Sequence, residues 1–323
     1  MNETVRVGSP TDILGLVPYL LNFPPRESLV VVLMSGGRLR LTMRVDLAEV
    51  AGAQTQLREV IARHDLETAV LIGYSASRPE AEQALWDTVE AVEGLVAIAD
   101  VIYTDDRRWW SLICEGECCP PEGTPYAVAE TSGAAQAVLA GLTTVSSRDE
   151  LVGWADGPDE ATRAALRAAY DPVLEDWYDL GRIEAKVDLV QELVRTHLAS
   201  GSLLSTEEAI LLALLVYEAP VRDAVLLGFD RETADKQVAL WRQVVAVALE
   251  PFDVPVLGLL GIAAWLSGNG ALQSACLERA EGLNPHAGLV SILRSIRRLT
   301  APPEMWEHWR ADLAAPGPDR SVA

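Results

Sequence analysis

The stretch from residue 28 to residue 47 constrains the fold most. Residues 28–34 are SLVVVLM, an almost unbroken β-branched and aliphatic run that is typical of a strand buried on both faces. Gly36 and Gly37 follow, and two adjacent glycines suit a hairpin turn because both can adopt positive φ. Residues 39–47 then alternate strictly between apolar and polar side chains, which predicts a strand with one core face and one polar face.

Helices are expected on either side of this hairpin. One should open at Ser9 and Pro10, and Pro18 inside it should limit it to short turns. The next should follow Asp46 and Glu49, which have the spacing of a capping box. The apolar face of this second helix consists of Val50, Leu57, Val60 and Ile61.

Strands and helices continue to alternate up to about residue 114. A further helix is expected to begin at Ser77 and to end at Gly94. Its buried stripe consists of Leu85, Trp86, Val89 and Val92. Further strands are predicted at residues 68–74, 96–103 and 108–114. Interleaving of this kind implies right-handed crossovers, so we expect an N-terminal α/β domain with a mixed, mostly parallel sheet.

The chain from about residue 149 onward shows only helical patterns, so the second half is expected to be all-α. Helices are predicted at residues 159–169, 173–199, 206–217, 219–228, 233–249, 254–267, 270–283, 286–299 and 303–313. Small residues at helix crossings, Gly268 in a turn and Asn284-Pro285 at an exit resemble one tetratricopeptide-type (TPR-like) helical hairpin. An ordinary helical bundle with alanine-rich crossings is the alternative.

The length of 323 residues is large for a single hydrophobic core, so two domains are expected. We place an α/β domain with a tryptophan- and cysteine-rich loop at residues 1–145, and a helical domain at residues 146–313. Residues 314–323, AAPGPDRSVA, have the composition of a disordered tail.

Composition and charge argue against several classes of function. A formal net charge of −21 repels phosphate backbones and anionic lipid, so no nucleic-acid or membrane partner is expected. We expect neither a transmembrane helix nor a signal peptide, because no apolar run of the required kind is present. Four cysteines in a chain of this length do not make a disulfide framework, which favours a reducing cytoplasm. A protein partner or a homo-oligomer stays open.

The most informative stretch for function is residues 107–126, RRWWSLICEGECCPPEGTPY, which we name the Trp–Cys loop. In a strand, Trp109 and Trp110 point to opposite faces. One of them is then core, while the other covers a groove with Arg107 or Arg108 stacked on it. The alternative is a tryptophan buried where the two domains join. We expect the loop to close over the sheet and to meet the helical half there.

Three of the four cysteines lie in this loop in a C-x3-C-C pattern: Cys114, Cys118 and Cys119. A structural zinc site normally has four ligands, and one cysteine pair here has acceptable spacing. Adjacent cysteines rarely both reach one metal, however, and every histidine is remote in sequence: His64, His197, His286 and His308. Three alternatives stay open, namely packing, a zinc site, and a reactive or redox role that includes a disulfide from Cys114.

Other candidate ligand-binding residues surround these thiols. The segment PPEGTP at 120–125 is stiff, and such a loop either holds a binding site or joins domains. The candidates on this segment and the preceding strand are Arg107, Arg108, Trp109, Trp110, Glu122 and Thr124. Arg40 and Arg44 share the polar face of the alternating strand with Asp46. They are paired or bind an anion if that face is covered, and they only discourage association if the strand is at an edge. The helix expected at Ser132-Gly133 is a weaker anion candidate.

Four segments carry a family resemblance: SPTDILGLVPYLLNFPPRESLVVVLM from residue 9, RVDL at 44–47, RWWSLIC from residue 108 and CCPPEGTP from residue 118. They are similar to an uncharacterised family of actinobacterial proteins, the domain of unknown function DUF4192. The resemblance extends from about residue 9 to the end of the helical half, and the Trp–Cys loop is its most specific part. It implies a family and a taxonomic setting, and no assigned activity.

The residues leave three functional hypotheses. The first is a non-catalytic protein for ligand binding or protein interaction, because the repeat-like hairpin is present and the common phosphate-loop, metalloprotease and hydrolase motifs are absent. The second is an enzyme or metal-binding protein that uses the Trp–Cys loop. The third is a nucleotide- or phosphate-binding domain. No reaction follows from the residues alone.

Overall fold

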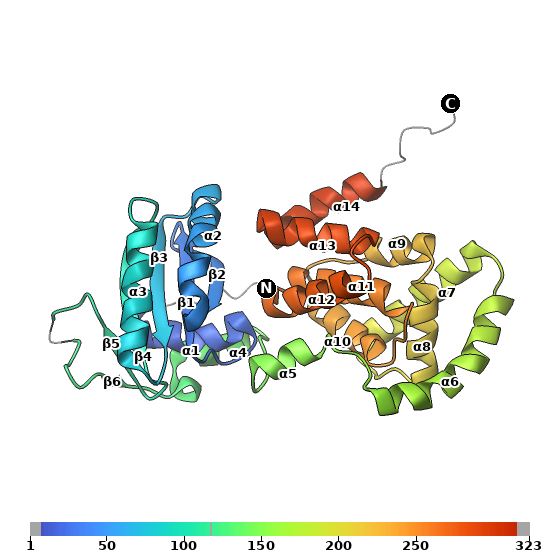
Figure 1. Ribbon diagram of the computed structural model, residues 1–323, viewed down its shortest axis with the longest axis horizontal. Helices are drawn as coiled ribbons and strands as arrows, with labels where there is room; N and C mark the ends of the chain where they lie inside the picture. Colours follow the sequence, from blue (N-terminus) through green and yellow to red (C-terminus); the bar gives the residue numbers. More distant parts are fainter. Residues whose placement is uncertain (1–7, 117, 315–323) are drawn as a thin grey trace. The chain divides into compact units, whose positions relative to one another are not determined.

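The structure is a computed structural model that describes residues 8–116 and 118–314. The chain forms two compact units, Met1–Arg148 and Asp149–Ala323, which are described separately here (Figure 1). The predicted tail at residues 314–323 lies outside the described residues, except for Ala314 at the end of the last helix. No helix in the described ranges is long and apolar enough to cross a membrane.

The first unit is built on a mixed sheet, and its strands lie, among the described residues, in the order β2-β1-β3-β4-β5-β6. These strands are β1 (Ser28–Ser35), β2 (Arg38–Asp46), β3 (Thr68–Tyr74), β4 (Ala97–Thr104), β5 (Arg108–Ser111) and β6 (Thr124–Pro125). The predicted hairpin is confirmed, because β1 and β2 pair antiparallel and Gly36 and Gly37 turn between them with φ of 58° and 67°. The strand predicted at 108–114 is shorter than expected and ends at Ser111.

The prediction of a mostly parallel sheet is wrong. Of the five neighbouring pairs that the structure describes, only β3 with β4 is parallel. Helix α2 (Val50–Arg63) returns the chain so that β3 runs in the direction of β2, since both strands are antiparallel to β1. However, β3 pairs with the far side of β1, so this crossover creates no parallel neighbour.

Helices lie on both faces of the sheet, and they are α1 (Pro10–Leu21), α2 and α3 (Arg78–Val92). Alternation along β1 supplies a core on each face. Leu29, Val31 and Leu33 pack with residues of α2 and α3, whereas Val30 and Val32 pack with residues of α1. The prediction that β1 is buried on both faces is therefore confirmed, and the predicted apolar face of α2 is buried as well.

Helix α1 continues through Pro18, so the prediction that this proline limits it to short turns is wrong. A proline in a helix interior removes one backbone hydrogen bond and crowds the preceding turn. That cost is offset by packing, because Leu14 and Val17 are fully buried and Pro18 is buried too.

Two predicted details of α2 and α3 are also wrong. Asp46 and Glu49 form no capping box, because the Asp46 carboxylate accepts a hydrogen bond from Arg44 at 2.5 Å instead. Trp86 is 43% exposed and does not belong to the buried stripe of α3. The small side chains of Ala81 and Ala84 lie in the buried face and allow the helix to approach the sheet closely.

Helix α4 (Ser132–Leu139) packs on α1 through glycine. Gly133 lies so close to Asp12 that an added Cβ would collide with the Asp12 carbonyl oxygen. The helix is capped by Thr131, whose side-chain oxygen accepts a hydrogen bond from the backbone N–H of Ala134. Gly133 is therefore explained by helix packing, which removes the reason for placing an anion there.

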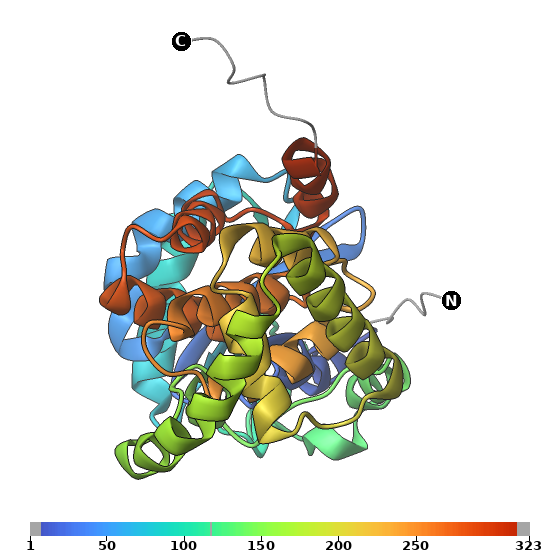
Figure 2. The ribbon, with the colours of Figure 1, turned by 90° about the vertical axis from the view of Figure 1, so that its right-hand side faces the viewer.

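The second unit consists, in the part of the chain that is described, of helices without a strand (Figure 2). They are α5 (Arg148–Gly153), α6 (Glu160–Asp179), α7 (Ile183–Ser200), α8 (Thr206–Leu215), α9 (Ala219–Leu227), α10 (Ala234–Val245), α11 (Asp253–Leu266), α12 (Gly270–Leu283), α13 (Gly288–Leu299) and α14 (Trp306–Ala314). Every residue of α11 is buried, so this helix forms the centre of the core. The largely helical second half is confirmed.

The break between the first long helices lies later than predicted. Helix α6 runs through Pro172 instead of ending before it, because Tyr170 and Val173 on either side are buried against α8. The chain turns instead at Gly181, whose φ is 62°. Further along, α11 and α12 pack closely, and Cys276 is fully buried. Their assignment as a TPR-like hairpin stays a prediction.

We expect Gly133→Ala to lower the thermal unfolding midpoint, because the added Cβ collides with backbone and overpacking costs about 1–3 kcal/mol. The matched control is Gly52→Ala in α2, where the added Cβ has nothing within 4 Å. Replacing that helical glycine should stabilise the protein by about 0.5–1 kcal/mol. Circular dichroism during heating measures both variants, and equal midpoints would contradict the close packing of α1 on α4.

Candidate functional site: the Trp–Cys loop

Strand β5 positions the two tryptophans on opposite faces of the sheet, as predicted. Trp109 is 6% exposed, packs with the residues of the α1 face, and donates from Nε1 to the Thr11 hydroxyl at 3.0 Å. Trp110 packs on the other face and stacks on Tyr103 of β4, with ring centroids 5.2 Å apart. Trp109 is thus a core residue, whereas Trp110 is half-buried and faces the loop.

The cation stacked on these rings is Arg78, so the expectation of Arg107 or Arg108 is wrong. The Arg78 guanidinium lies 5.3 Å from the Trp110 centroid and 5.5 Å from the Tyr103 centroid. Its Nε also contacts the Glu82 carboxylate at 2.7 Å, one turn further along α3. Arg78 is the first residue of α3, which places its side chain at the end of the sheet where β4 turns into β5.

The loop after β5 is held by hydrogen bonds to that strand. Arg108 donates from Nη1 to the carbonyl oxygens of Glu122 and Gly123, at 3.1 and 2.8 Å. Trp110 donates from Nε1 to the Pro121 carbonyl oxygen at 3.0 Å. Gly123 has φ of 78° and packs so closely that an added Cβ would collide with the Trp110 indole. Arg108 and Trp110 therefore organise the loop.

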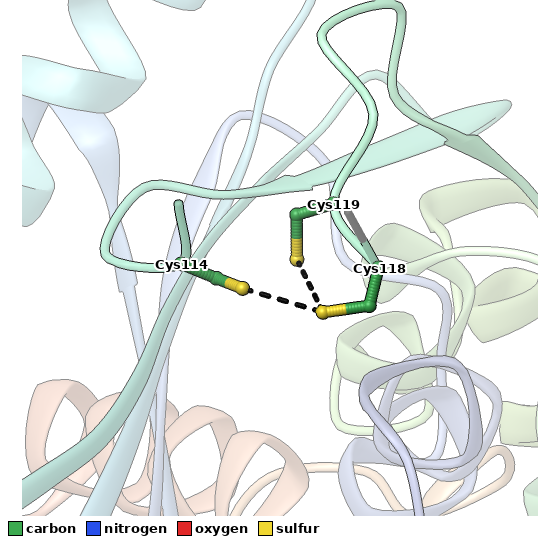
Figure 3. A group of neighbouring side chains, drawn as sticks. All are labelled: Cys114, Cys118 and Cys119. Carbon is green, nitrogen blue, oxygen red and sulfur yellow. Dashed lines mark hydrogen bonds between the residues drawn. The ribbon is translucent and has the colours of Figure 1, made fainter. Parts of the chain in front are cut away.

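The loop brings three thiols together (Figure 3). The Sγ atoms of Cys114, Cys118 and Cys119 all lie within 4.8 Å of one another. Cys114 is 3.5 Å from Cys118, and Cys118 is 3.9 Å from Cys119. Cys118 is exposed and the other two are half-buried. The sulfur atoms of the adjacent Cys118 and Cys119 lie on the same side of the loop and contact each other, while Cys118 also contacts Cys114. Whether both reach one metal stays a prediction.

Hydrogen bonds from the sheet hold the first thiol in position. The backbone N–H of Cys114 donates to the Ser111 hydroxyl at 3.2 Å, and that hydroxyl donates to Asp100 Oδ1 on β4 at 2.6 Å. The backbone N–H of Cys119 donates to the Gly116 carbonyl oxygen at 3.0 Å, which holds these two residues close together. The thiols thus converge from two ends of one tight turn.

The thiols of Cys114 and Cys119 differ in acidity. The pKa of the Cys114 thiol lies below its ordinary value, chiefly because of its hydrogen bond with the Cys119 thiol and then of a backbone hydrogen bond at Gly116. The same hydrogen bond with Cys114, followed by desolvation, raises the pKa of Cys119 to about 12. Cys114 therefore ionises more readily than Cys119, and the Cys119 thiol is the proton donor in the hydrogen bond between them.

A cavity of about 270 Å³ borders on this cluster at Cys119. It is lined by Arg78, Trp109, Trp110, Ser111, Cys119, Pro120, Pro121 and Thr124. Arg78 is the charged residue among those that line it.

The remaining predicted site residues do not gather there. The side chains of Arg107 and Glu122 are exposed, and only the backbone carbonyl of Glu122 contacts Arg108. Arg40 and Arg44 lie on β2, which is the opposite edge of the sheet from β5 and β6. Strand β2 is thus an edge strand among the described residues, and Arg44 is paired with Asp46. The role of the two arginines stays a prediction. A meeting of the loop with the helical unit stays a prediction.

Sequence reasoning missed Arg78, Tyr103, Ser111 and Asp100. One signal was available for Arg78, since a helix that follows a strand and precedes a parallel neighbour begins at the carboxyl end of both strands. Strand β3, helix α3 and strand β4 form this arrangement, and Arg78 is the first residue of the helix. The roles of Ser111 and Asp100 had no signal, because their hydrogen bond depends on the pairing of β4 with β5.

The fold and the loop together define a class of protein in which a mixed α/β sheet unit carries a three-thiol loop and is followed by a helical unit. The chain belongs to the family described as Domain of unknown function (DUF4192), whose sequence model matches residues 10–304. The resemblance seen in the loop and at the start of the chain is therefore confirmed. No curated protein and no solved structure matches the chain.

We expect iodoacetamide to label the metal-free protein in a set order as pH rises. Cys114 should be alkylated at lower pH than an ordinary cysteine, because its pKa is lowered and only the thiolate reacts. Cys119, with its pKa raised to about 12, should resist labelling up to strongly alkaline pH. Peptide mass spectrometry with fragmentation assigns each sulfur, and buried Cys276 is the internal control. Coincident pH profiles for Cys114 and Cys119 would contradict this geometry.

Proposed function

We propose that the Trp–Cys loop binds a soft divalent metal ion, best matched by zinc, through the thiolates of Cys114, Cys118 and Cys119. The observation that carries this proposal is the convergence of three Sγ atoms within 4.8 Å of one another. Thiolate sulfur is a preferred ligand of zinc, and cysteine-rich sets of three or four ligands are common in zinc sites.

The sulfur separations support this assignment. Zinc–sulfur bonds are about 2.3 Å long, so two thiolates on a tetrahedral zinc ion lie about 3.8 Å apart. The separations of 3.5 Å between Cys114 and Cys118 and of 3.9 Å between Cys118 and Cys119 lie on either side of that value. Metal binding therefore requires only small movements of side chains, and the hydrogen bonds of Arg108 and Trp110 hold the loop that carries them.

We propose a binding site and not a reaction centre as its role, in keeping with a non-catalytic protein. Among the described residues, the cluster consists of the three cysteines, with no histidine, aspartate or glutamate. The phosphate-binding hypothesis has less support, since Arg44 is paired with Asp46 and Gly133 is packed against α1. A protein partner for the helical unit and a homo-oligomer stay predictions.

We expect the purified protein to retain stoichiometric zinc after dialysis, as measured by plasma mass spectrometry. Cys114→Ser, Cys118→Ser and Cys119→Ser should each weaken zinc binding by more than about 100-fold, because even groups that only orient a ligand contribute about 10–100-fold. The control is Cys276→Ala, which removes a buried thiol from the helical unit and should keep the metal. Zinc-free wild-type protein that also fails to bind added zinc would refute the site.

A second candidate function, oxidation of two thiols by peroxide, is favoured by the distance between two of the sulfur atoms. The Sγ atoms of Cys114 and Cys118 are hydrogen-bonded at 3.5 Å, and Cys118 is exposed to solvent-borne oxidant. With hydrogen peroxide, one thiol sulfur takes an oxygen atom to become a sulfenic acid and releases water. The second thiol then attacks that sulfur, forms the S–S bond and releases a second water. The metal-free loop would thus act as a peroxide-responsive dithiol.

We expect peroxide to convert metal-free protein to a form that has lost two hydrogen atoms, with the bond between Cys114 and Cys118. Cys118→Ser should abolish that bond, whereas Cys119→Ser should keep it because the 3.5 Å pair remains. Intact and peptide mass spectrometry distinguish the products, and zinc should protect the thiols from oxidation. A dominant bond between Cys118 and Cys119 would contradict the pairing that we assign.

A further inference from the structure

Strand β4 contains one extra residue shortly before it pairs with β5. Its parallel pairing with β3 matches Ala69 with Ile98 but Val70 with Asp100, so Ala99 is the inserted residue of a β-bulge. A bulge bends a strand and changes the direction of the side chains that follow, and bulges are frequent beside functional sites. The first side chain after this bulge is the Asp100 carboxylate.

The bulge determines the face of the sheet on which Asp100 lies. Ile98 packs on the face covered by α2 and α3, and strict alternation would put residue 100 on that face as well. After the bulge, Val101 takes this face, while Ile102 packs on the α1 face. Asp100 therefore shares the α1 face with Ile102 and with Ser111, which pairs with Ile102 across β4 and β5.

Hydrogen bonds connect Asp100 to the first residue of the thiol cluster. Its Oδ1 accepts from the backbone N–H of Val101 at 2.8 Å and from the Ser111 hydroxyl at 2.6 Å. The Ser111 oxygen in turn accepts from the backbone N–H of Cys114 at 3.2 Å. Because the hydroxyl donates its hydrogen to Asp100, its lone pairs are left for the N–H of Cys114.

Cys114 depends on such a contact because of its place in the chain. It follows the end of β5 at Ser111, where the backbone has left the strand. A backbone outside regular structure keeps its conformational entropy unless another contact orders it. With this contact in place, the Cys114 sulfur lies 3.5 Å from the sulfur of Cys118, which is exposed.

We infer that Asp100 and Ser111 are the positioning residues of the thiol site and direct oxidation to the pair Cys114 and Cys118. The inference rests on the thiol site proposed above and adds the part of the sheet that selects the two sulfurs. Hydrogen peroxide takes one hydrogen from each thiol, its O–O bond breaks, the S–S bond forms and two waters leave. Asp100 and Ser111 exchange no atoms in this reaction and act through geometry alone.

The variants Ser111→Thr and Ser111→Val test the hydroxyl, because their side chains have nearly the same shape and both suit a strand. In metal-free protein treated with peroxide, Ser111→Thr should form the bond between Cys114 and Cys118 as the wild type does. Ser111→Val should form it at least about tenfold more slowly and give more of the other pairings, since a misplacement of about 1 Å can cost about 100-fold. Peptide mass spectrometry of timed, alkylated samples measures both, and equal rates and pairings would overturn the inference.

The carboxylate is tested in the same assay. Asp100→Asn keeps an oxygen that accepts from Ser111 and should restore the wild-type pairing, whereas Asp100→Leu removes it and should behave as Ser111→Val. The control is Asp87→Ala, which removes a carboxylate on α3 that accepts from Gln83 at 2.7 Å and should leave the reaction unchanged. Circular dichroism identifies the folded variants, and a folded Asp100→Leu that oxidises as the wild type does would remove Asp100 from this role.

Zinc affinity separates the failure of this inference from the failure of the metal site. Ser111→Val should bind zinc about 10–100-fold more weakly than Ser111→Thr, which is the range for residues that orient a ligand. Wild-type protein that binds no zinc, while the two variants still differ in oxidation, would overturn the metal site and support the inference. Wild-type protein that forms no bond between Cys114 and Cys118 would overturn the inference together with the peroxide-responsive dithiol.

Discussion

The contacts of the Trp110 indole are the constraint on which the candidate site depends. Its ring stacks on Tyr103 of the sheet, its Nε1 holds the Pro121 carbonyl, and Gly123 packs directly against it. Arg108 reinforces the same segment from the neighbouring position on β5. Together they attach residues 121–123 of the Trp–Cys loop to β5, so the segment that carries the thiols is held at both ends.

Holding a loop in this way changes the cost of binding. Ordering one residue of backbone takes about 1–2 kcal/mol. In the Trp–Cys loop, hydrogen bonds to β5 and burial of the tryptophans offset this loss of entropy when the chain folds. A ligand that meets three sulfurs already within 4.8 Å of one another loses little affinity to ordering. The contacts that make the loop stiff therefore also keep its three thiols in place for a ligand.

The β1–β2 hairpin, the burial of β1 on both faces and the opposite directions of Trp109 and Trp110 all followed from the period of side chains along a strand. The order of the strands did not follow from this period. Strand β3 pairs with β1 through backbone hydrogen bonds, and the backbone groups are alike in almost every residue, so the sequence carries no signal for the choice of neighbour. The meeting of Cys118 with Cys119 was missed for a related reason. Irregular loops have no period, so spacing says nothing about where adjacent side chains point.

Local residue patterns alone settled the type of most elements, the core faces of the first strands and the choice of the Trp–Cys loop as the place of interest. Contacts between distant segments decided the rest: Arg78 on Trp110, Asp100 under Ser111 and three sulfurs at one point. The physical reason is the length of chain over which each kind of signal acts. Propensity and periodicity act over one or two turns of chain, whereas a site is a set of distances between side chains that only the folded sheet brings together.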